Sequence, residues 1–327
     1  MKTIACEVCG SDQQKFLFKG WDRIFGIPGE FNLVQCEECG LLFVNPQPGE
    51  EVLKKHYPKA YYTPRASQYQ EYSWFRKRAL EEYFGYGERS HSSKVSSLFR
   101  KMVLWPLKVR YRNSIPFIPN GCLLDIGCGN GTELYKLKKM GWETYGVEMD
   151  EEASKRARSE GISVFTGNLF EANLPDQFFD VVRMSFVLEH LPNPRETLVE
   201  IKRILKPQGR IYISIQNARS LNHWLFRERW FSLDVPRHLF SFTPETIQWL
   251  LSSLDLEVRS VQFDSGTRTF LASLQYWLND RFRKGGALQV SQPLLKSHFL
   301  KHLSQPFCWL VDRIGLGDLI HLEVVQA

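Results

Sequence analysis

The chain has 327 residues, of which 43% are hydrophobic and 24% are charged, and its net charge is +6 at pH 7. This composition excludes a fibrous or largely disordered protein, and the length allows one large domain with appendages or two domains. So small a net charge does not by itself indicate nucleic acid or a membrane surface as partner. No apolar run has the about 18 residues of a membrane span, and the first residues do not resemble a signal peptide. We therefore expect a cytoplasmic protein.

Near the N-terminus, four cysteines form two Cys-x-x-Cys-Gly sequences, one with Cys6 and Cys9 and one with Cys36 and Cys39. In a reducing compartment such pairs indicate metal rather than disulfides. Four thiolates complete the tetrahedral shell of Zn²⁺ and leave no position open for substrate, so the predicted zinc site is structural. A redox dithiol or chance pairing is the alternative interpretation.

A basic stretch follows between residues 94 and 112. Its basic residues are interleaved with apolar ones and with no acidic residue: Lys94, Arg100, Lys101, Lys108, Arg110 and Arg112. Such a stretch either lies on an anionic membrane surface or packs as an ordinary helix on the core. A second helical stretch of similar character, residues 267–314, precedes the last apolar run.

From Gly121 onward, short apolar runs alternate with stretches of helical periodicity. The predicted strands are residues 122–126, 144–147, 163–165, 180–184, 210–215 and 319–325; the clearest predicted helices are residues 133–140 and 196–206. This alternation predicts an α/β fold with parallel strands and crossover helices, which binds ligands at the carboxyl ends of its strands.

At the first such end, Gly127, Gly129 and Gly131 follow a strand and open a helix. Glycine lets backbone approach a ligand where a side chain would block it. Asp125 precedes the loop, and Glu148 ends the next strand, where a carboxylate can accept hydrogen bonds from both ribose hydroxyls. The pattern therefore predicts a nucleoside-containing ligand.

The sequences LLDIGCGNG and GVEMD resemble those of class I S-adenosylmethionine-dependent methyltransferases, over about residues 110 to 265. The resemblance implies a Rossmann-like sheet of seven strands, in which Gly127 and Gly129 line the methionine part and Glu148 holds the ribose. Asn168 stands where the family usually has an aspartate near the adenine, and its amide oxygen can still accept from the adenine amino group. The expected cofactor contacts are Asp125, Gly127, Cys128, Gly129, Glu148, Met149, Asn168 and Leu169.

Three residues are candidates for the chemistry of methyl transfer. Glu189 and His190 lie just beyond the predicted fourth strand, and His238 lies in the loop before a helix that Thr243 would cap. A neutral imidazole suits proton removal near pH 7, and His238 is the leading candidate for the base. The alternative is that either histidine only packs or positions its loop.

These patterns divide the chain into five parts. They are a four-cysteine zinc module (1–48), an aromatic and basic connector or lid (49–118), the cofactor-binding core (119–266), a helical insertion facing a membrane or partner (267–314), and the final core strand (315–327). By the methyltransferase resemblance, the connector tyrosines Tyr57, Tyr61 and Tyr62 either pack between helices or help form the acceptor pocket.

The N-terminal pattern also resembles bacterial methyltransferases that carry a zinc module and work with sugar and surface-polysaccharide enzymes. This resemblance implies a small-molecule acceptor, a saccharide or lipid-linked saccharide, with contact at the inner face of the membrane through the basic stretches. An RNA methyltransferase is the first alternative, although no RNA-binding motif accompanies the cysteines. A non-catalytic S-adenosylmethionine-binding protein is the second.

Overall fold

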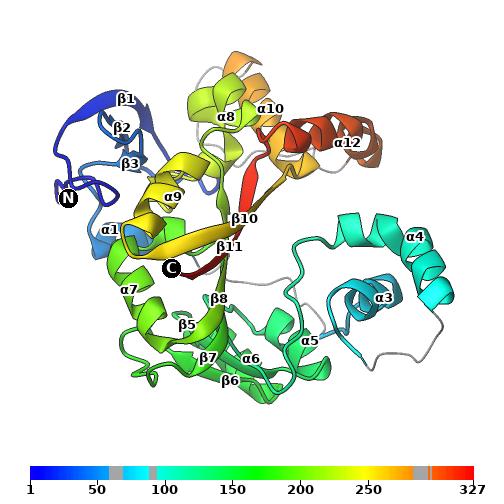
Figure 1. Cartoon of the computed structure of the whole chain (residues 1–327). Helices are drawn as coiled ribbons and strands as arrows, with labels where there is room; N and C mark the ends of the chain where they lie inside the picture. The colour runs from blue at the N-terminus through cyan, green and yellow to red at the C-terminus, as the bar shows by residue number, and fades with distance from the viewer. Residues whose placement is uncertain (59–68, 88–93, 283–293, 295–296) are drawn as a thin grey trace. The chain divides into compact units, whose positions relative to one another are not determined.

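The computed structural model describes residues 1–58, 69–87, 94–282, 294 and 297–327; Tyr61 and Tyr62 lie outside them. The chain divides into two compact units. One comprises residues 1–62, 184–202 and 213–327, and the other comprises residues 63–183 and 203–212. Figure 1 shows the elements of both units along the chain.

A seven-stranded sheet contains all of the strands predicted from Gly121 onward. Its order is β6-β5-β4-β7-β8-β11-β10. The bounds are β4 Cys122–Ile126, β5 Glu143–Glu148, β6 Ser163–Thr166, β7 Phe179–Ser185, β8 Leu205–Gln216, β10 Leu256–Asp264 and β11 Leu319–Gln326. In chain order this reads third, second, first, fourth, fifth, seventh, sixth, and the first five follow the Rossmann arrangement. The predicted Rossmann-like sheet is confirmed.

The parallel strands β4, β5 and β6 form the part of the sheet that carries the glycine loop. All five residues of β4 are buried, as expected for a parallel strand covered on both faces. Helix α5 (Thr132–Lys139) buries Leu134 and Leu137, and α6 (Glu151–Ser159) is capped by Asp150, whose side chain accepts from the backbone N of Ala153 at 2.7 Å. At the other edge, β10 and β11 are antiparallel and lie side by side (Figure 1).

The N-terminal residues form a second, antiparallel sheet in the order β1-β2-β3-β9. Its strands are β1 Gln14–Gly20, β2 Phe31–Cys36, β3 Leu42–Val44 and β9 Phe240–Ser241. The last strand comes from the segment after β8: Leu42 pairs with Ser241 and Phe43 with Phe240. The cysteine-bearing region is thus completed by residues far along the sequence.

Helices make up most of the remainder. Their bounds are α1 Glu50–Lys55, α3 Trp74–Tyr83, α4 Lys94–Arg110, η1 Leu188–His190, α7 Pro194–Ile204, α8 Leu221–Phe226, η2 Arg227–Arg229, η3 Phe231–Leu233, α9 Pro244–Ser252, α10 Thr267–Phe282 and α12 His298–Arg313. The predicted cap of α9 is confirmed, because the Thr243 side chain accepts from the backbone N of Thr246 in a reciprocal capping box. Among the described residues, no helix is both long and apolar enough to cross a bilayer.

Candidate active site and cysteine cluster

The glycine loop joins β4 to α5. Gly127, Gly129 and Gly131 all have positive φ, between 56° and 73°. A Cβ atom at Gly131 would lie 2.8 Å from Cβ of Ala157, so that glycine permits close packing on α6. A Cβ atom at Gly129 would meet no protein atom within 4 Å, so the backbone there is open to a ligand.

Glu148 is linked directly to this loop. One carboxylate oxygen accepts from the backbone N of Gly129 at 2.7 Å, and the other accepts from the backbone N of Asp150 at 2.9 Å. Each carboxylate oxygen can accept more than one hydrogen bond, so both can still receive the hydroxyls of a ribose. Next to it, Met149 is 67% exposed and provides an apolar surface at the same strand end.

Asn168 and Leu169 follow the end of β6. The Asn168 side-chain oxygen accepts from the backbone N of Glu171 at 2.9 Å, and the Asn168 N–H donates to the Glu171 carboxylate at 3.0 Å. The amide therefore shapes its own turn, a role that the sequence interpretation did not include. Leu169 is 5% exposed, so its side chain supports the turn from inside.

Asp125 lies beneath the loop, only 4% exposed. Burial raises its pKa to about 6, and the positive charge of Arg183, with Nη1 3.4 Å from Oδ2, opposes that shift. Sequence reasoning missed Arg183, although a basic residue inside the apolar run DVVRM is a signal that could have identified it. The pair keeps a charged group fixed under the glycine loop.

Residues 69–76 contact the glycine loop and the start of α5, and no local sequence pattern predicts these contacts. The Tyr69 hydroxyl donates to the carbonyl oxygen of Asn130 at 2.6 Å. The Tyr72 hydroxyl and the Arg76 guanidinium both donate to Oε1 of Glu133, at 2.6 and 3.0 Å. These contacts hold the loop and the first turn of α5 in place.

The three candidates for proton transfer lie together in the other unit. One carboxylate oxygen of Glu189 and one ring nitrogen each of His190 and His238 lie within 4.8 Å of one another. The two imidazole rings meet edge to face, with centroids 4.6 Å apart. Glu189 and His190 belong to η1, directly after β7, and His238 precedes β9. The sequence placed these residues in separate loops, and the fold brings them together.

Hydrogen bonds fix the protonation of both rings. Nδ1 of His238 is 2.8 Å from the carbonyl oxygen of Ser232, and Nδ1 of His190 is 3.0 Å from that of Arg237 and from the Tyr57 hydroxyl. A carbonyl oxygen only accepts, so each Nδ1 carries the hydrogen and each Nε2 keeps its lone pair. Burial lowers the pKa of both histidines, so both rings are neutral bases at pH 7.

Glu189 has the opposite protonation from a surface carboxylate. It is 1% exposed, and burial raises its pKa to about 8, although hydrogen bonding lowers it in part. The carboxyl group is therefore mostly protonated at pH 7, and it places no negative charge beside the two imidazoles.

We expect the free energy of unfolding of the native chain to fall relative to that of Glu189→Gln as the pH rises from 5 to 8. The carboxyl group ionises near pH 4.5 in the unfolded chain but near pH 8 in the folded one, so its stabilising contribution is lost as pH rises through that window. The slope is at most about 1.4 kcal/mol per pH unit, and glutamine removes it. Urea unfolding at pH 5, 6.5 and 8 measures the difference; a difference that does not change with pH would contradict the assigned protonation.

An ionic cluster around the buried Arg237 holds the loop before His238. Arg237 is 0% exposed, and its guanidinium donates to both oxygens of Asp22, at 2.8 and 2.9 Å. It also donates to Asp234 and, at 2.7 Å, to the carbonyl oxygen of His56. Nδ1 of His56 is 3.0 Å from Asp22. Residues of the N-terminal region thus fix the position of the loop that carries His238.

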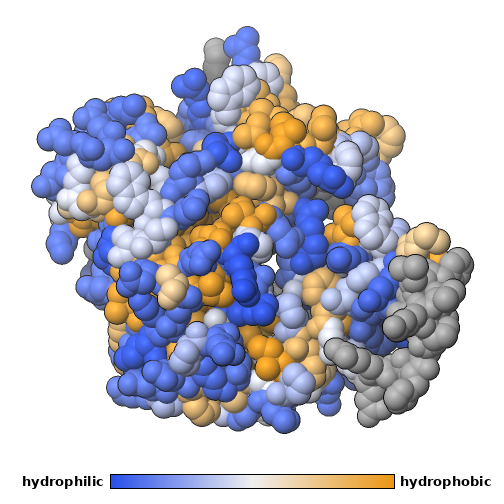
Figure 2. Space-filling view, in the orientation of Figure 1, coloured by the Kyte–Doolittle hydropathy of each residue, from blue (hydrophilic) through white to orange (hydrophobic). Residues whose placement is uncertain are grey.

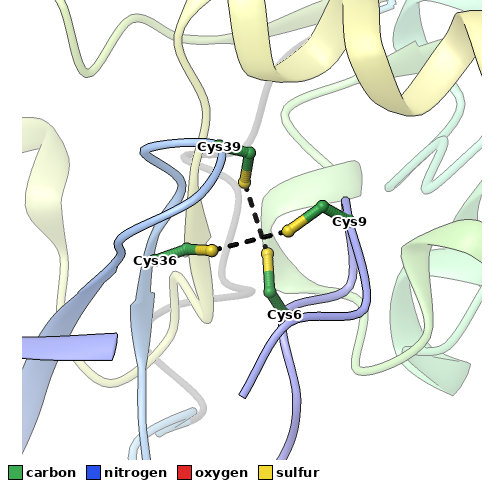
Figure 3. Close-up of side chains that lie close together, drawn as sticks. All are labelled: Cys6, Cys9, Cys36 and Cys39. Carbon is green, nitrogen blue, oxygen red and sulfur yellow. Dashed lines mark hydrogen bonds between the residues drawn. The ribbon is translucent and has the colours of Figure 1, made fainter. Parts of the chain in front are cut away.

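The four N-terminal cysteines converge, as predicted, with their sulfur atoms pointing toward one another (Figure 3). All four Sγ atoms lie within 4.8 Å of each other, with Cys6 to Cys39 at 3.4 Å and Cys9 to Cys36 at 3.5 Å. Zn–S bonds of about 2.3 Å in a tetrahedron require S···S distances of about 3.8 Å. The four thiols therefore fit one zinc ion.

The two halves of this cluster have the same backbone design. Gly10 N donates to the carbonyl oxygen of Cys6 at 2.8 Å, and Gly40 N donates to that of Cys36 at 3.1 Å. Backbone N–H groups two and three residues further on also point at the sulfur of Cys6 and of Cys36. Burial raises the pKa of Cys6 to about 11 despite these donors, whereas at Cys36 the donors, together with hydrogen bonds from the Cys9 and Cys39 side chains, outweigh burial and lower the pKa. Such donors stabilise thiolates, which are the metal-binding form.

Comparison with known proteins shows similarity to methyltransferases. Residues 101–261 match the family model described as a methyltransferase domain. Ubiquinone biosynthesis O-methyltransferase of Methylococcus capsulatus is 29% identical over 127 residues, which are 37% of this chain and 53% of that protein. The enzyme of the same name from Pseudomonas paraeruginosa is 30% identical over 129 residues, 37% of this chain and 55% of that protein. The chain spans about half the length of these curated relatives.

Among solved structures, a SAM-dependent methyltransferase from Archaeoglobus fulgidus aligns with 70% of this chain and 98% of its own, at 24% identity and a TM-score of 0.46. The family match ends at residue 261 and begins at residue 101, so it leaves out the cysteine cluster and the helices α10 and α12.

Proposed function

We propose that the protein is a class I methyltransferase that transfers a methyl group from S-adenosylmethionine to a small-molecule acceptor; the match of residues 101–261 to a methyltransferase family model supports this. When bound, S-adenosylmethionine supplies an electrophilic methyl group. The protein then has to bind the cofactor, align the acceptor for in-line attack and, for a hydroxyl acceptor, remove a proton.

Cofactor binding rests on the link between Gly129 and Glu148. The open backbone at Gly129 and the carboxylate of Glu148 are joined by a 2.7 Å hydrogen bond, so a ligand that touches one is positioned beside the other. A nucleoside with a ribose diol fits this arrangement. Asp125 and Asn168 would hold the loops on either side.

Glu148→Ala should weaken S-adenosylmethionine binding by about 10- to 100-fold, since each hydrogen bond to a charged group is worth about 1.5–3 kcal/mol. Titration calorimetry measures the affinity. Glu143→Ala removes a carboxylate at the exposed start of the same strand and should leave binding unchanged. Equal affinity of Glu148→Ala and the native protein would show that the cofactor site is wrongly assigned.

Proton removal is proposed for the imidazole pair, with His238 as the base and His190 in edge-to-face contact with it. Support comes from the fixed Nδ1–H tautomers, which leave Nε2 basic, and from the lowered pKa values, which keep both rings neutral. A neutral Glu189 completes a cluster without a competing ionised base. The activity should therefore persist below pH 6.5, where an ordinary histidine would be protonated.

Within the small-molecule class, we propose a saccharide or lipid-linked saccharide acceptor. The proposal is supported by the combination of a cysteine module with a methyltransferase core, which resembles enzymes of sugar and surface-polysaccharide pathways. Because two relatives are named ubiquinone biosynthesis O-methyltransferases, a phenolic compound should be assayed as the alternative acceptor. Sugar nucleotides, a catechol and RNA, assayed side by side with labelled cofactor, separate these classes.

A structural Zn²⁺ ion at Cys6, Cys9, Cys36 and Cys39 is part of the proposal. Elemental analysis of the purified protein should give about one zinc per chain, and Cys36→Ser should lose the metal and lower the melting temperature. Cys122→Ser replaces a buried thiol in the other unit and should retain zinc. Native protein that contains no zinc, with a disulfide among these cysteines, would contradict the assignment.

A further inference from the structure

The helices α3 and α4 leave several large apolar side chains in contact with solvent. On α3, Trp74 and Phe75 are 61% and 58% exposed; on α4, Met102, Val103 and Trp105 are 67%, 57% and 56% exposed. We call these five residues, together with the exposed basic residues Lys101, Lys108 and Arg110, the α3–α4 surface. Contiguous exposed apolar groups on a folded protein mark an interaction site.

The exposure follows the helical period of α4. Leu104 and Leu107 are half-buried, whereas Met102 and Trp105 are exposed. At 100° per residue, Met102 and Trp105 lie on the side opposite Leu104 and Leu107, and the half-buried Val109 lies between Met102 and Trp105. The helix is therefore apolar on two sides, one against the protein and one against solvent.

Positive charge borders the outer apolar side. Lys101, Lys108 and Arg110 are exposed, and no acidic residue occurs from residue 94 to residue 113. The acidic residues of α3 are paired, Glu81 with Arg78 and Glu82 with Arg100. On the helical projection, Lys101 and Lys108 lie beside Trp105, and Arg110 lies on the far side of Met102. Long basic side chains at the edges of an apolar stripe can reach the phosphates of lipid headgroups while the stripe enters the interface.

The two helices run antiparallel, and this brings the exposed aromatic residues of α3 toward the end of α4. The Arg76 guanidinium lies 5.9 Å from the ring of Tyr111, and at the other end of α3 the Tyr83 hydroxyl donates to the carbonyl oxygen of Lys101. Trp74 and Phe75, at the start of α3, therefore belong to the part of α3 that lies near the end of α4. Tryptophan at such a position suits the boundary between headgroups and acyl chains.

We propose that the α3–α4 surface binds an anionic phospholipid bilayer. Charge complementarity favours this partner, because the bordering cations match anionic headgroups. The apolar side chains of Met102 and Val103 would gain nothing from the phosphates of RNA, whereas they gain burial in lipid. The proposal does not depend on which acceptor the protein methylates.

A second exposed apolar region does not share this charge pattern. Figure 2 shows apolar side chains gathered over α10 and α12. On and directly after α12, Phe299, Leu303 and Ile314 are at least 60% exposed, but the neighbouring charges of Asp312 and Arg313 are opposite. That region therefore gives no preference for an anionic surface.

The test is sedimentation of the full-length protein with vesicles of phosphatidylcholine alone or mixed with phosphatidylglycerol. We expect binding to the mixed vesicles, weakened by salt. Lys101→Gln with Lys108→Gln should weaken it by about 25-fold, at about fivefold per lysine. Met102→Gln with Trp105→Gln should also weaken it, by at least about tenfold.

Trp224→Gln serves as the matched control, because this tryptophan is 71% exposed on α8 and should not affect binding. Unchanged melting temperature and cofactor affinity would show that the α4 variants remain folded. Equal binding to neutral vesicles, equal binding of the α4 variants and the native chain, or binding to RNA but not to vesicles would each overturn the proposal.

Discussion

Arg237→Met should lower the free energy of unfolding by about 3–5 kcal/mol, the cost of leaving a buried charge without its partner. Asp22 is 0% exposed and would lose the guanidinium that contacts both of its oxygens. Burial acts to raise the pKa of the Asp22 carboxyl group, but the hydrogen bonds that Arg237 donates to it help to lower that pKa. Denaturant unfolding at pH 7 measures the loss.

The surface pair of Arg203 and Asp176 provides the control. Their side chains are 38% and 73% exposed, so Arg203→Met should cost less than about 1 kcal/mol. If Arg237→Met also costs less than about 1 kcal/mol, the buried cluster does not hold the fold together. In the expected case, the methyl-transfer rate should also fall, because the cluster positions the loop that precedes His238.

His238→Asn should reduce the rate of methyl transfer by about 10²- to 10⁴-fold, the usual contribution of a general base. The asparagine amide can still donate to the carbonyl oxygen of Ser232 in place of Nδ1, but it cannot accept a proton. Cofactor affinity should be unchanged, since the proposed cofactor residues belong to the other unit. Single-turnover kinetics with saturating cofactor measure the effect.

His302→Asn changes an exposed histidine of α12 and should leave the rate unchanged. If His190→Asn abolishes the reaction while His238→Asn retains it, the base assignment is reversed. If neither variant loses activity between pH 6 and 8, no histidine of this cluster acts as a base.

The strands from β4 to β8 and the glycine loop could be predicted because their signals are local. A run such as CLLDI followed by glycines combines apolar burial with a turn that only glycine fits easily, and the structure places each where the sequence indicated. The two Cys-x-x-Cys turns could also be predicted from local sequence, because each half of the cluster is shaped by its own glycine and backbone N–H groups. Periodicity and turn chemistry are sufficient for such features.

Contacts between distant segments could not be predicted in the same way. The pairing of β3 with β9 joins Phe43 to Phe240, and the Asp22–Arg237 contact spans a similar separation. The sequence DVPRH shows that Arg237 stands beside His238, but it does not show which acid meets the guanidinium. The protonation of Glu189 depends on burial by the folded chain, and its pKa therefore has no local signal.

We propose that this protein methylates a small molecule with S-adenosylmethionine bound at Gly129 and Glu148. The most direct test of this proposal is the transfer of label from methyl-labelled cofactor into sugar nucleotides, lipid-linked saccharides, catechols and total RNA, compared between the native protein and Glu148→Ala. We predict label in a small-molecule fraction that the variant does not produce. Label only in RNA would exclude a small-molecule acceptor, and equal labelling by both proteins would exclude a cofactor site at Glu148.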